Sequence, residues 1–353
     1  MLPVFSSATT NVTNCGTLGI SGETYVLQNN TISNNTCFTI IGQNIKFDLN
    51  GKKITITGYQ ASAIVITGGF SVEIYNGKIY LEDKTISNSQ ANVGGIQVLG
   101  LSAQTILTVH DMYISGRAWL VNFNSGTLNF YNNVLYPVKY SRNPYAMRIV
   151  NAIGGTIRGN IINGLNCRGI LIENSKNFVI ANNYADCSES AIPGIDGTGP
   201  HTLRIRETSP TNGGNFTIYG NTFIGKALAG SGATSFEGAF IGSWPALIYG
   251  NTFSGTSQII GIDGAAMALE GDLTDSRIYN NRFISNINSL RVGYINAGEK
   301  FGYFDSNAMV KDTSFPQTYH SIMTDKFGQR FEENNTFLNT SYLNGAQKSD
   351  ILM

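Results

Sequence analysis

The interval between Ile180 and Ile218 gathers side chains whose types could do chemistry. Its reactive residues are Asp186, Glu189, Asp196, His201, Arg204, Arg206 and Glu207. Carboxylates and an imidazole can transfer protons, and a pair of carboxylates in one cleft can hydrolyse a glycosidic bond. We take Asp186, Glu189, Asp196, His201 and Glu207 as candidates for a catalytic role, without assigning a role to any one of them.

Two arginines of this interval point to an acidic ligand. In Leu203-Arg204-Ile205-Arg206 the period-two alternation of a strand places the aliphatic residues inside and both arginines outside. Arg148 and Arg291 have the same phasing, so we predict that they share this face and bind substrate. A guanidinium group grips a carboxylate with two donors, which would suit an acidic sugar.

The element that must carry these side chains is a repeat. An aliphatic residue, two variable positions, an asparagine and a further apolar residue recur at IRGNI (157), IANNY (180), IYGNTF (218 and 248) and IYNNRF (278), with looser copies toward the N-terminus. The spacing is about 21 residues or more, with variable insertions, which is typical of a parallel β-helix. Each coil is too small to bury its apolar side chains alone, so stacked coils must build one continuous core.

Two columns of residues follow from this repeat. Asparagine at the corner tolerates left-handed backbone and its amide can bond to neighbouring turns; these residues are Asn160, Asn183, Asn221, Asn251 and Asn281. The tyrosine after the leading aliphatic residue should face outward; these residues are Tyr75, Tyr219, Tyr249 and Tyr279. Such a stripe would stack on sugars or, as we favour, stabilise the sheet through contacts between neighbours.

The four cysteines are spaced by about one coil. Cys15 and Cys37 are 22 residues apart, and Cys167 and Cys187 are 20 apart. Residues one coil apart lie on neighbouring rungs, about 4.8 Å from each other, a distance that a disulfide can bridge after small adjustment. We predict the disulfides Cys15–Cys37 and Cys167–Cys187, which would imply an oxidising compartment or a hyperthermophilic host. Four buried free thiols are the alternative.

Composition excludes some classes of partner. The 23 Lys and Arg balance 23 Asp and Glu, and no basic cluster occurs, so we expect no nucleic acid as a partner. No apolar run reaches the length of a membrane span, and the first ten residues lack the features of a signal peptide. The histidines are scattered and the cysteines are assigned to disulfides, so we predict no metal site.

The first coils resemble those of the pectate-lyase-like right-handed β-helix superfamily, and within it the secreted carbohydrate-binding and copper-binding-protein-like repeat proteins. The resemblance is carried by Cys15-Gly16, Tyr25-Val26-Leu27, Cys37-Phe38-Thr39-Ile40 and Phe47-Asp48-Leu49-Asn50-Gly51 and covers roughly residues 15–300. It implies an all-β, right-handed parallel β-helix. The superfamily includes lyases, hydrolases, epimerases, phage tailspikes and surface proteins, so fold alone does not select a function.

The enzymatic patterns of these relatives are incomplete here. A lyase would add Ca²⁺, or arginine, to neutralise the uronate carboxylate, but no set of calcium-binding carboxylates is recognisable beside the arginines. The pattern of the related polygalacturonases is echoed only by Asp196-Gly197 and Arg204-Ile205-Arg206, without paired aspartates or Gly-His-Gly. A solvated loop with surface ion pairs is the alternative for the whole interval.

We therefore expect a noncatalytic structural β-helix that binds a polysaccharide or surface glycan, at an extracellular, cell-surface or virion-surface location. A polysaccharide lyase or glycoside hydrolase acting on an acidic polysaccharide is the alternative. We divide the chain into an N-terminal cap and first coil (1–40), the β-helix (41–300) and an aromatic-rich segment (301–353) that caps the solenoid or docks a second copy of the chain.

Overall fold

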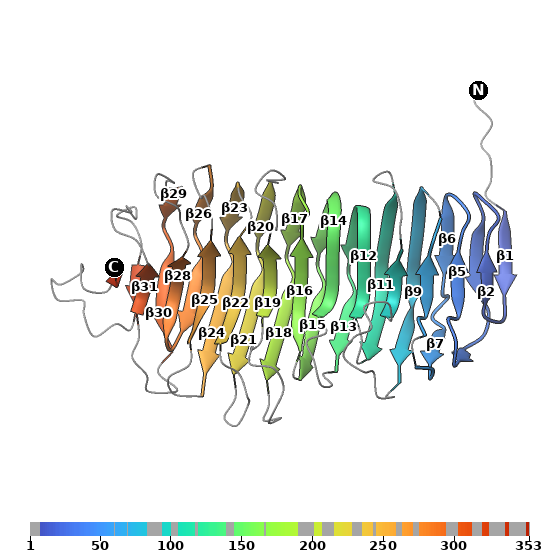
Figure 1. Cartoon of the computed structure of the whole chain (residues 1–353), viewed down its shortest axis with the longest axis horizontal. Coiled ribbons are helices and arrows are strands. Elements are labelled where there is room, and N and C mark those ends of the chain that lie inside the picture. Colours follow the sequence, from blue (N-terminus) through green and yellow to red (C-terminus); the bar gives the residue numbers. More distant parts are fainter. Residues whose placement is uncertain are drawn as a thin grey trace.

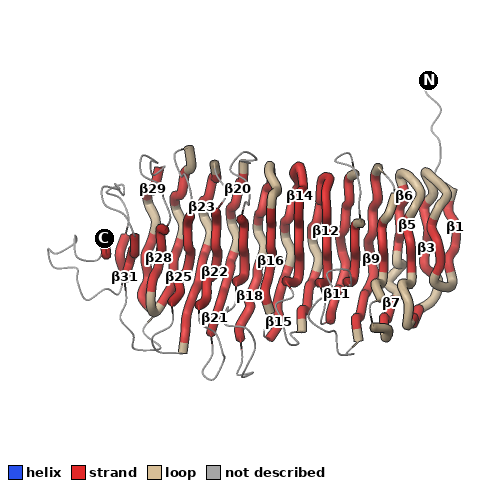
Figure 2. The backbone as a smooth tube through the Cα atoms, viewed as in Figure 1, coloured by secondary structure: helices blue, strands red, loops and turns tan. Residues whose placement is uncertain are grey.

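The computed structural model shows a solenoid of short strands, elongated along one axis, with β1 at one end and the strands after residue 300 at the other (Figure 1). Figure 2 shows strands joined by loops, and no helix occurs in the described residues. Those residues are 8–59, 61–68, 70–82, 94–99, 105–116, 119–138, 145–165, 167–189, 201–206, 215–227, 235–242, 245–258, 263–270, 275–293, 303–312, 320–324, 336–338 and 351–352.

Each coil contributes a strand to each of three sheets, and successive coils pair in parallel. The predicted all-β parallel β-helix is thus confirmed. The three sheets are joined to one another because several long strands bend from one sheet into the next.

Sheet 1 consists of the following strands: β1 (Thr9–Val12), β3 (Thr24–Leu27), β6 (Ile45–Asp48), the first half of β9 (Ser71–Leu81), the first half of β11 (Ile106–Gly116), the second half of β12 (Trp119–Tyr131), the second half of β14 (Tyr145–Arg158), β17 (Phe178–Ala181), β20 (Phe216–Tyr219), β23 (Ala246–Tyr249), β26 (Arg277–Tyr279) and β29 (Tyr303–Asp305).

Sheet 2 follows it in each coil and consists of β4 (Thr31–Ser33), β7 (Lys53–Ile56), the second halves of β9 and β11, β13 (Val134–Pro137), β15 (Ile161–Leu165), β18 (Tyr184–Glu189), β21 (Thr222–Ala227), β24 (Thr252–Ser257), β27 (Arg282–Ser285), β30 (Ala308–Lys311) and β32 (Thr336–Leu338).

Sheet 3 completes the coil and consists of β2 (Gly16–Leu18), β5 (Phe38–Ile40), β8 (Ile64–Ile66), β10 (Gly94–Val98), the first halves of β12 and β14, β16 (Arg168–Glu173), β19 (His201–Arg206), β22 (Ser235–Gly242), β25 (Asp263–Glu270), β28 (Asn288–Gly293), β31 (His320–Thr324) and β33 (Ile351–Leu352).

The core is a set of columns of identical or similar side chains that run along the solenoid axis. Ile218, Ile248 and Ile278 occupy the same register position on neighbouring strands of sheet 1 and are fully buried, as the repeat predicted. On sheet 2 the rings of Phe223 and Phe253 stack with their centroids 5.9 Å apart. Such columns bury apolar surface continuously from coil to coil, which no single coil could do.

A buried column of asparagines marks the corner between sheets 1 and 2. Asn251 shows the pattern: its Oδ1 accepts from the backbone N–H and the Nδ2 of Asn221, at 3.0 and 2.9 Å. Its own Nδ2 donates to the carbonyl of Ile218 at 2.8 Å and to Oδ1 of Asn281 at 2.9 Å. We call this column the asparagine ladder; its members are Asn133, Asn160, Asn183, Asn221, Asn251, Asn281 and Asn307.

The left-handed backbone lies one residue before each ladder asparagine, which corrects the expectation that the ladder residue itself adopts it. Gly159, Asn182, Gly220, Gly250 and Asn280 have φ values of 64, 54, 65, 64 and 54°. The tight turn therefore needs a residue that tolerates positive φ, followed by one whose amide faces inward. The two functions that we had placed in one asparagine belong to neighbouring residues.

Both predicted disulfides are present, but only the first joins equivalent positions on neighbouring rungs. Cys15 and Cys37 directly precede Gly16 and Phe38, which are register partners on sheet 3, so this disulfide joins neighbouring rungs as the spacing implied. Cys187 lies on sheet 2, where its register partner on the preceding coil is Gly164, and Cys167 directly precedes β16 of sheet 3. The second disulfide therefore spans the corner between sheets 2 and 3 as well as one rung.

Strand pairing continues past both predicted segment boundaries. Strands β1 to β5 already pair in parallel with the coils that follow them. Beyond residue 300, β29 and β30 extend the ladders of sheets 1 and 2. The division at residues 40 and 300, and the capping or docking roles of the ends, stay predictions. Across the described residues we find no helix of the length and hydropathy that would cross a bilayer.

The asparagine ladder should make a large contribution to stability. We expect Asn251→Ala to lower the free energy of unfolding by about 3 to 5 kcal/mol. The change removes the oxygen that accepts from the backbone N–H and the side-chain amide of Asn221, and it removes the donor to the buried carbonyl of Ile218 and to Oδ1 of Asn281. Urea denaturation of the variant and the parent measures this. The control is Asn280→Gly at the exposed, left-handed position, where a change of less than about 0.5 kcal/mol is expected; equal effects would contradict a special role for the ladder.

The second disulfide should also stabilise the fold measurably. Replacing both Cys167 and Cys187 by alanine removes a cross-link between residues 20 positions apart, which is expected to cost about 3 kcal/mol. Denaturation of the double variant checks this value. A midpoint equal to that of the parent would show that the cross-link adds nothing to the stacked coils.

Candidate functional site

The longest connections of the chain border sheet 3. The corner between sheets 1 and 2 is short: β20 ends at Tyr219 and β21 begins at Thr222. By contrast, β18 ends at Glu189 and β19 begins at His201, and β19 ends at Arg206 while β20 begins at Phe216. The insertion singled out by sequence thus flanks one strand of sheet 3 on both sides. Insertions gathered on one face of a solenoid often mark its binding face.

Several outward-facing side chains of sheet 3 are shielded from solvent. The outward-facing side chains of Gln97, Asn122 and Leu171 are only 1, 4 and 8% exposed. On the outer face of sheet 2, by comparison, Ile161 and Tyr184 are 46 and 40% exposed. Polar groups lie on this face, and among the described residues Nε2 of Gln97 and Nε of Arg204 have no hydrogen-bond partner. Buried donors of this kind are usually satisfied by another molecule.

Arginines lie on the outer face of sheet 3, as the alternation predicted. Arg148, Leu171, Arg204 and Phe240 follow each other in register on β14, β16, β19 and β22. Arg291 continues the same column on β28, although the structure describes only its backbone. Arg206 lies two positions farther along β19 and faces the same way as Arg204. The structure therefore brings the predicted arginines to one face.

Glu173 joins two of these arginines. Its Oε1 accepts from Nε of Arg206 at 2.6 Å, and its Oε2 lies 3.5 Å from Nη2 of Arg148. Glu173 is 8% exposed, whereas the Arg206 side chain is 46% exposed. The carboxylate therefore holds both guanidinium groups against the outer face of sheet 3, while much of Arg206 stays accessible to a ligand.

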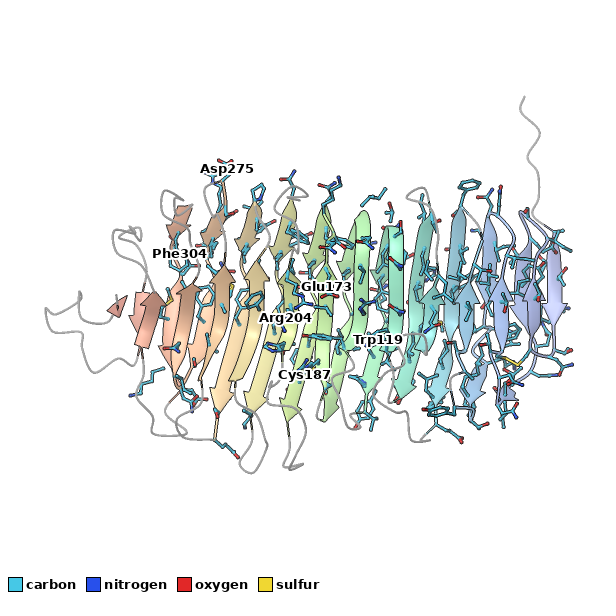
Figure 3. All side chains as sticks on the ribbon, viewed as in Figure 1. Trp119, Glu173, Cys187, Arg204, Asp275 and Phe304 are labelled. Carbon is cyan, nitrogen blue, oxygen red and sulfur yellow. A yellow bond between two sulfur atoms is a disulfide. The ribbon has the colours of Figure 1, made fainter. Side chains whose placement is uncertain are left out.

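Aromatic rings fix the remaining guanidinium planes. Cζ of Arg148 lies 4.9 Å from the ring centre of Trp119, and Cζ of Arg204 lies 5.1 Å from that of Phe240. A guanidinium over a ring keeps its N–H groups in the plane, directed away from the ring. Trp119, Glu173 and Arg204 lie along the middle of the solenoid in Figure 3. Among the described side chains, Arg148, Arg204, Arg206 and Glu173 together give this face an excess of positive charge.

The candidate catalytic residues are not gathered at this face in the part of the chain that is described. Asp186 lies on sheet 2, where Tyr184 donates its hydroxyl hydrogen to Oδ2 at 3.4 Å. His201 begins β19 with the same parity as inward-facing Leu203 and is 4% exposed. Asp196 and Glu207 lie outside the described residues, and so does the side chain of Glu189.

Sequence reasoning missed Glu173, Trp119 and Phe240. Glu173 ends the strand Ile170-Leu171-Ile172-Glu173, whose phase matches that of Leu203-Arg204-Ile205-Arg206. Aligning these two strands by their aliphatic residues would have placed Glu173 opposite Arg206. This strand has leucine, Leu171, at the position of Arg204, so the arginine pattern alone does not reveal Glu173.

The tyrosine column on sheet 1 is a structural ladder. Tyr219, Tyr249 and Tyr279 stack nearly parallel, with ring centres 5.2 and 5.3 Å apart. The ring faces that a sugar would contact are therefore largely used within the stack. Tyr75, the fourth predicted member, belongs to a separate stack farther toward the N-terminus. The favoured interpretation of this stripe, sheet stabilisation, agrees with the geometry.

A second polar cluster lies on sheet 1 near the N-terminus. The ring of His110 is sandwiched between Tyr75 and Tyr131, with centre-to-centre distances of 5.0 and 4.8 Å. Nε2 of His110 lies 3.2 Å from Oε1 of Glu73, and Nδ1 lies 2.8 Å from Oδ2 of Asp111.

Glu73 also contacts Lys46, whose Nζ lies 2.9 Å from Oε2. Burial is the largest influence on Glu73 and favours its neutral form, but hydrogen bonds and charges from Lys46 and His110 together outweigh burial and lower the pKa of this carboxyl. The hydrogen bond that Lys46 donates to Glu73 in turn raises the pKa of Lys46. Among the described residues no group of three or more His, Cys, Asp or Glu side chains is placed to hold a metal ion.

No protein-family model matches the chain, and no curated protein matches it. Among solved structures, the chain is similar to the A-module of mannuronan C-5 epimerase AlgE6 from Azotobacter vinelandii, with 12% sequence identity, 89% of each chain covered and a TM-score of 0.46. At this level of similarity the neighbour says nothing about ligand or activity, which must be inferred from the chain's own side chains.

The Glu73 cluster predicts a pH dependence of stability. Because the pKa of Glu73 is lowered below its ordinary value of 4.5, its stabilising contribution is present above that value and is lost as the pH falls through the lowered pKa. We expect Glu73→Gln to cost about 0.5 to 1 kcal/mol at pH 7 and progressively less as the pH falls below 4.5. Thermal melts of parent and variant over this range test the sign. A difference that grows on acidification would contradict it.

Proposed function

We propose that the chain binds an acidic polysaccharide along the outer face of sheet 3. The observation that carries the proposal is the array of Arg148, Arg204 and Arg206 on this face, held in place by Glu173, Trp119 and Phe240. This geometry supports the noncatalytic, glycan-binding interpretation of the sequence.

The charge and spacing of the array suit a polyanion. Arg148 and Arg204 are separated by two rungs of the same column, which corresponds to about 10 Å along the solenoid axis. A polysaccharide that runs along this axis would meet cationic groups on alternate coils. Carboxylates accept two parallel hydrogen bonds from one guanidinium, and such bonds are stronger where the groups are partly buried than at an open surface.

The arginines are preorganised before any ligand arrives. Glu173 and the two aromatic rings restrict side chains that would otherwise lose much rotational freedom on binding. The unpartnered Nε donor of Arg204 and amide of Gln97 supply further hydrogen bonds for hydroxyl or carboxylate oxygens.

Binding without turnover is favoured over catalysis by the position of the acids. Both carboxylate oxygens of Glu173 contact arginines, so this group is engaged in orienting them and is poorly placed to accept a proton from a sugar. Asp186 lies on a different sheet from the arginines. The two disulfides suit an extracellular, cell-surface or virion-surface setting, where such glycans occur.

Calorimetric titration with polygalacturonate and alginate tests the proposal, with neutral dextran for comparison. We expect both polyuronates to bind and dextran not to bind, and we expect Arg204→Ala to weaken the binding at least tenfold. Affinity should fall as the salt concentration rises, because ionic contacts are screened. Glu173→Gln should weaken binding less than Arg204→Ala, because it loosens the arginines without removing one.

The matched control is Arg282→Ala, which removes an exposed arginine from the outer face of sheet 2. Equal losses in the Arg204 and Arg282 variants would reduce the effect to net charge and overturn the site. Unsaturated or reducing-end products released from the polyuronates would instead establish a lyase or hydrolase. The absence of binding to either polyuronate would refute an acidic-glycan ligand of these two kinds.

A further inference from the structure

A surface pocket of about 340 Å³ lies at the corner between sheets 1 and 2, across the coils at residues 51–134. It is on a different part of the solenoid from the arginine array, which occupies sheet 3. The pocket forms where the asparagine ladder is absent: the ladder position on β9 is Gly77, and on β11 it is Met112. A side chain at Gly77 would collide with Leu49, since an added Cβ would lie 2.2 Å from its Cβ.

The lining combines an apolar floor with a polar rim. Met112, which is buried, Tyr113 and Val134 contribute apolar surface. Asn76 and Asn132 add planar amide groups that can donate and accept. Lys78 and Asp111 add one positive and one negative charge, so the rim has no net charge.

Asp111 on this rim is held by a chain of contacts from sheet 1. Its Oδ2 lies 2.8 Å from Nδ1 of His110, and the other ring nitrogen of His110 faces Glu73 at 3.2 Å. Lys46 contacts the far oxygen of Glu73 at 2.9 Å. The imidazole plane cannot rotate freely because Tyr75 and Tyr131 stack on its two faces.

Such a chain of contacts fixes the orientation of one exposed carboxylate. A surface aspartate gains little stability from so many partners, since ion pairs near solvent are weak. The arrangement is what a binding site needs, because a polar group held in place before binding loses little freedom when a ligand arrives. This series of contacts begins at Lys46 and ends at Asp111, beside the pocket.

We propose that this pocket binds one neutral pyranose residue. A pyranose has an apolar face of C–H groups, which matches the floor and the ring of Tyr113, and an edge of hydroxyl groups, which matches the carboxylate and amides of the rim. The volume is at the lower end of the range for small-molecule sites, as a single sugar requires. The balanced charge of the rim separates this ligand from the acidic glycan proposed for sheet 3, so the two proposals stand or fall independently.

Saturation-transfer NMR with the methyl glycosides of glucose, galactose and mannose tests the pocket, with methyl glucuronide as the acidic comparison. We expect transfer to at least one neutral glycoside, and at least a fivefold reduction in Asp111→Asn and in Lys78→Met. Asparagine suits the left-handed backbone of position 111, because Asn76 and Asn132 occupy the equivalent corner positions of the neighbouring coils with φ values of 58 and 57°. The Asp111→Asn variant should therefore fold. His110→Phe keeps the ring stack but releases Asp111, and should give an intermediate loss.

Two variants control for the fold and for the other site. Asn280→Asp makes the reverse exchange at an equivalent left-handed corner position, φ 54°, far from the pocket, and should leave the signal unchanged. Arg204→Ala on sheet 3 should also leave it unchanged. No transfer to any of the three neutral glycosides, transfer that persists in both pocket variants, transfer lost with Arg204→Ala, or stronger transfer to the glucuronide would each overturn the proposal.

Discussion

The interaction on which the structure depends is the side-chain amide of the corner asparagines, which joins each coil to its two neighbours. An amide has two donor hydrogens and an oxygen with two lone pairs, and Asn251 uses the donors and the oxygen with adjacent coils. Because every ladder member is buried, a partner missing in one coil would leave polar atoms of two coils unsatisfied. The ladder therefore fixes both the turn and the register of sheets 1 and 2.

This constraint explains where the insertions are found. A corner that must present a left-handed residue and then a buried amide admits no extra residues, so Gly220 and Asn221 alone separate β20 from β21. Added length has to enter at the borders of sheet 3 instead. The same coils place Arg148, Arg204 and Glu173 on the outer face of that sheet, between the insertions. The short corner between sheets 1 and 2 thus stays constant, while the borders of sheet 3 accept connections of different length.

Much of the fold could be predicted because it is a periodic property of the sequence. The recurrence at Ile218, Ile248 and Ile278 directly gave the stacking of coils, and alternation gave the outward direction of Arg148 and Arg204. Contacts between different coils were harder. The pairing of Glu173 with Arg206 depends on the register of β16 and β19, which an insertion between them hides from a linear reading. Asp186, by contrast, follows Asn183 of the ladder by three residues, so the repeat itself places it on sheet 2.

The ladder also has a direction. Each asparagine donates both its backbone N–H and a side-chain hydrogen toward the next coil in the sequence, from Asn133 to Asn307. At its beginning the column needs only an ordinary peptide donor, and the backbone N–H of Met112 supplies it to Asn133. Starting the column therefore requires no special side chain, whereas stopping it requires an acceptor for the last amide. The two ends of the ladder are chemically unequal for this reason.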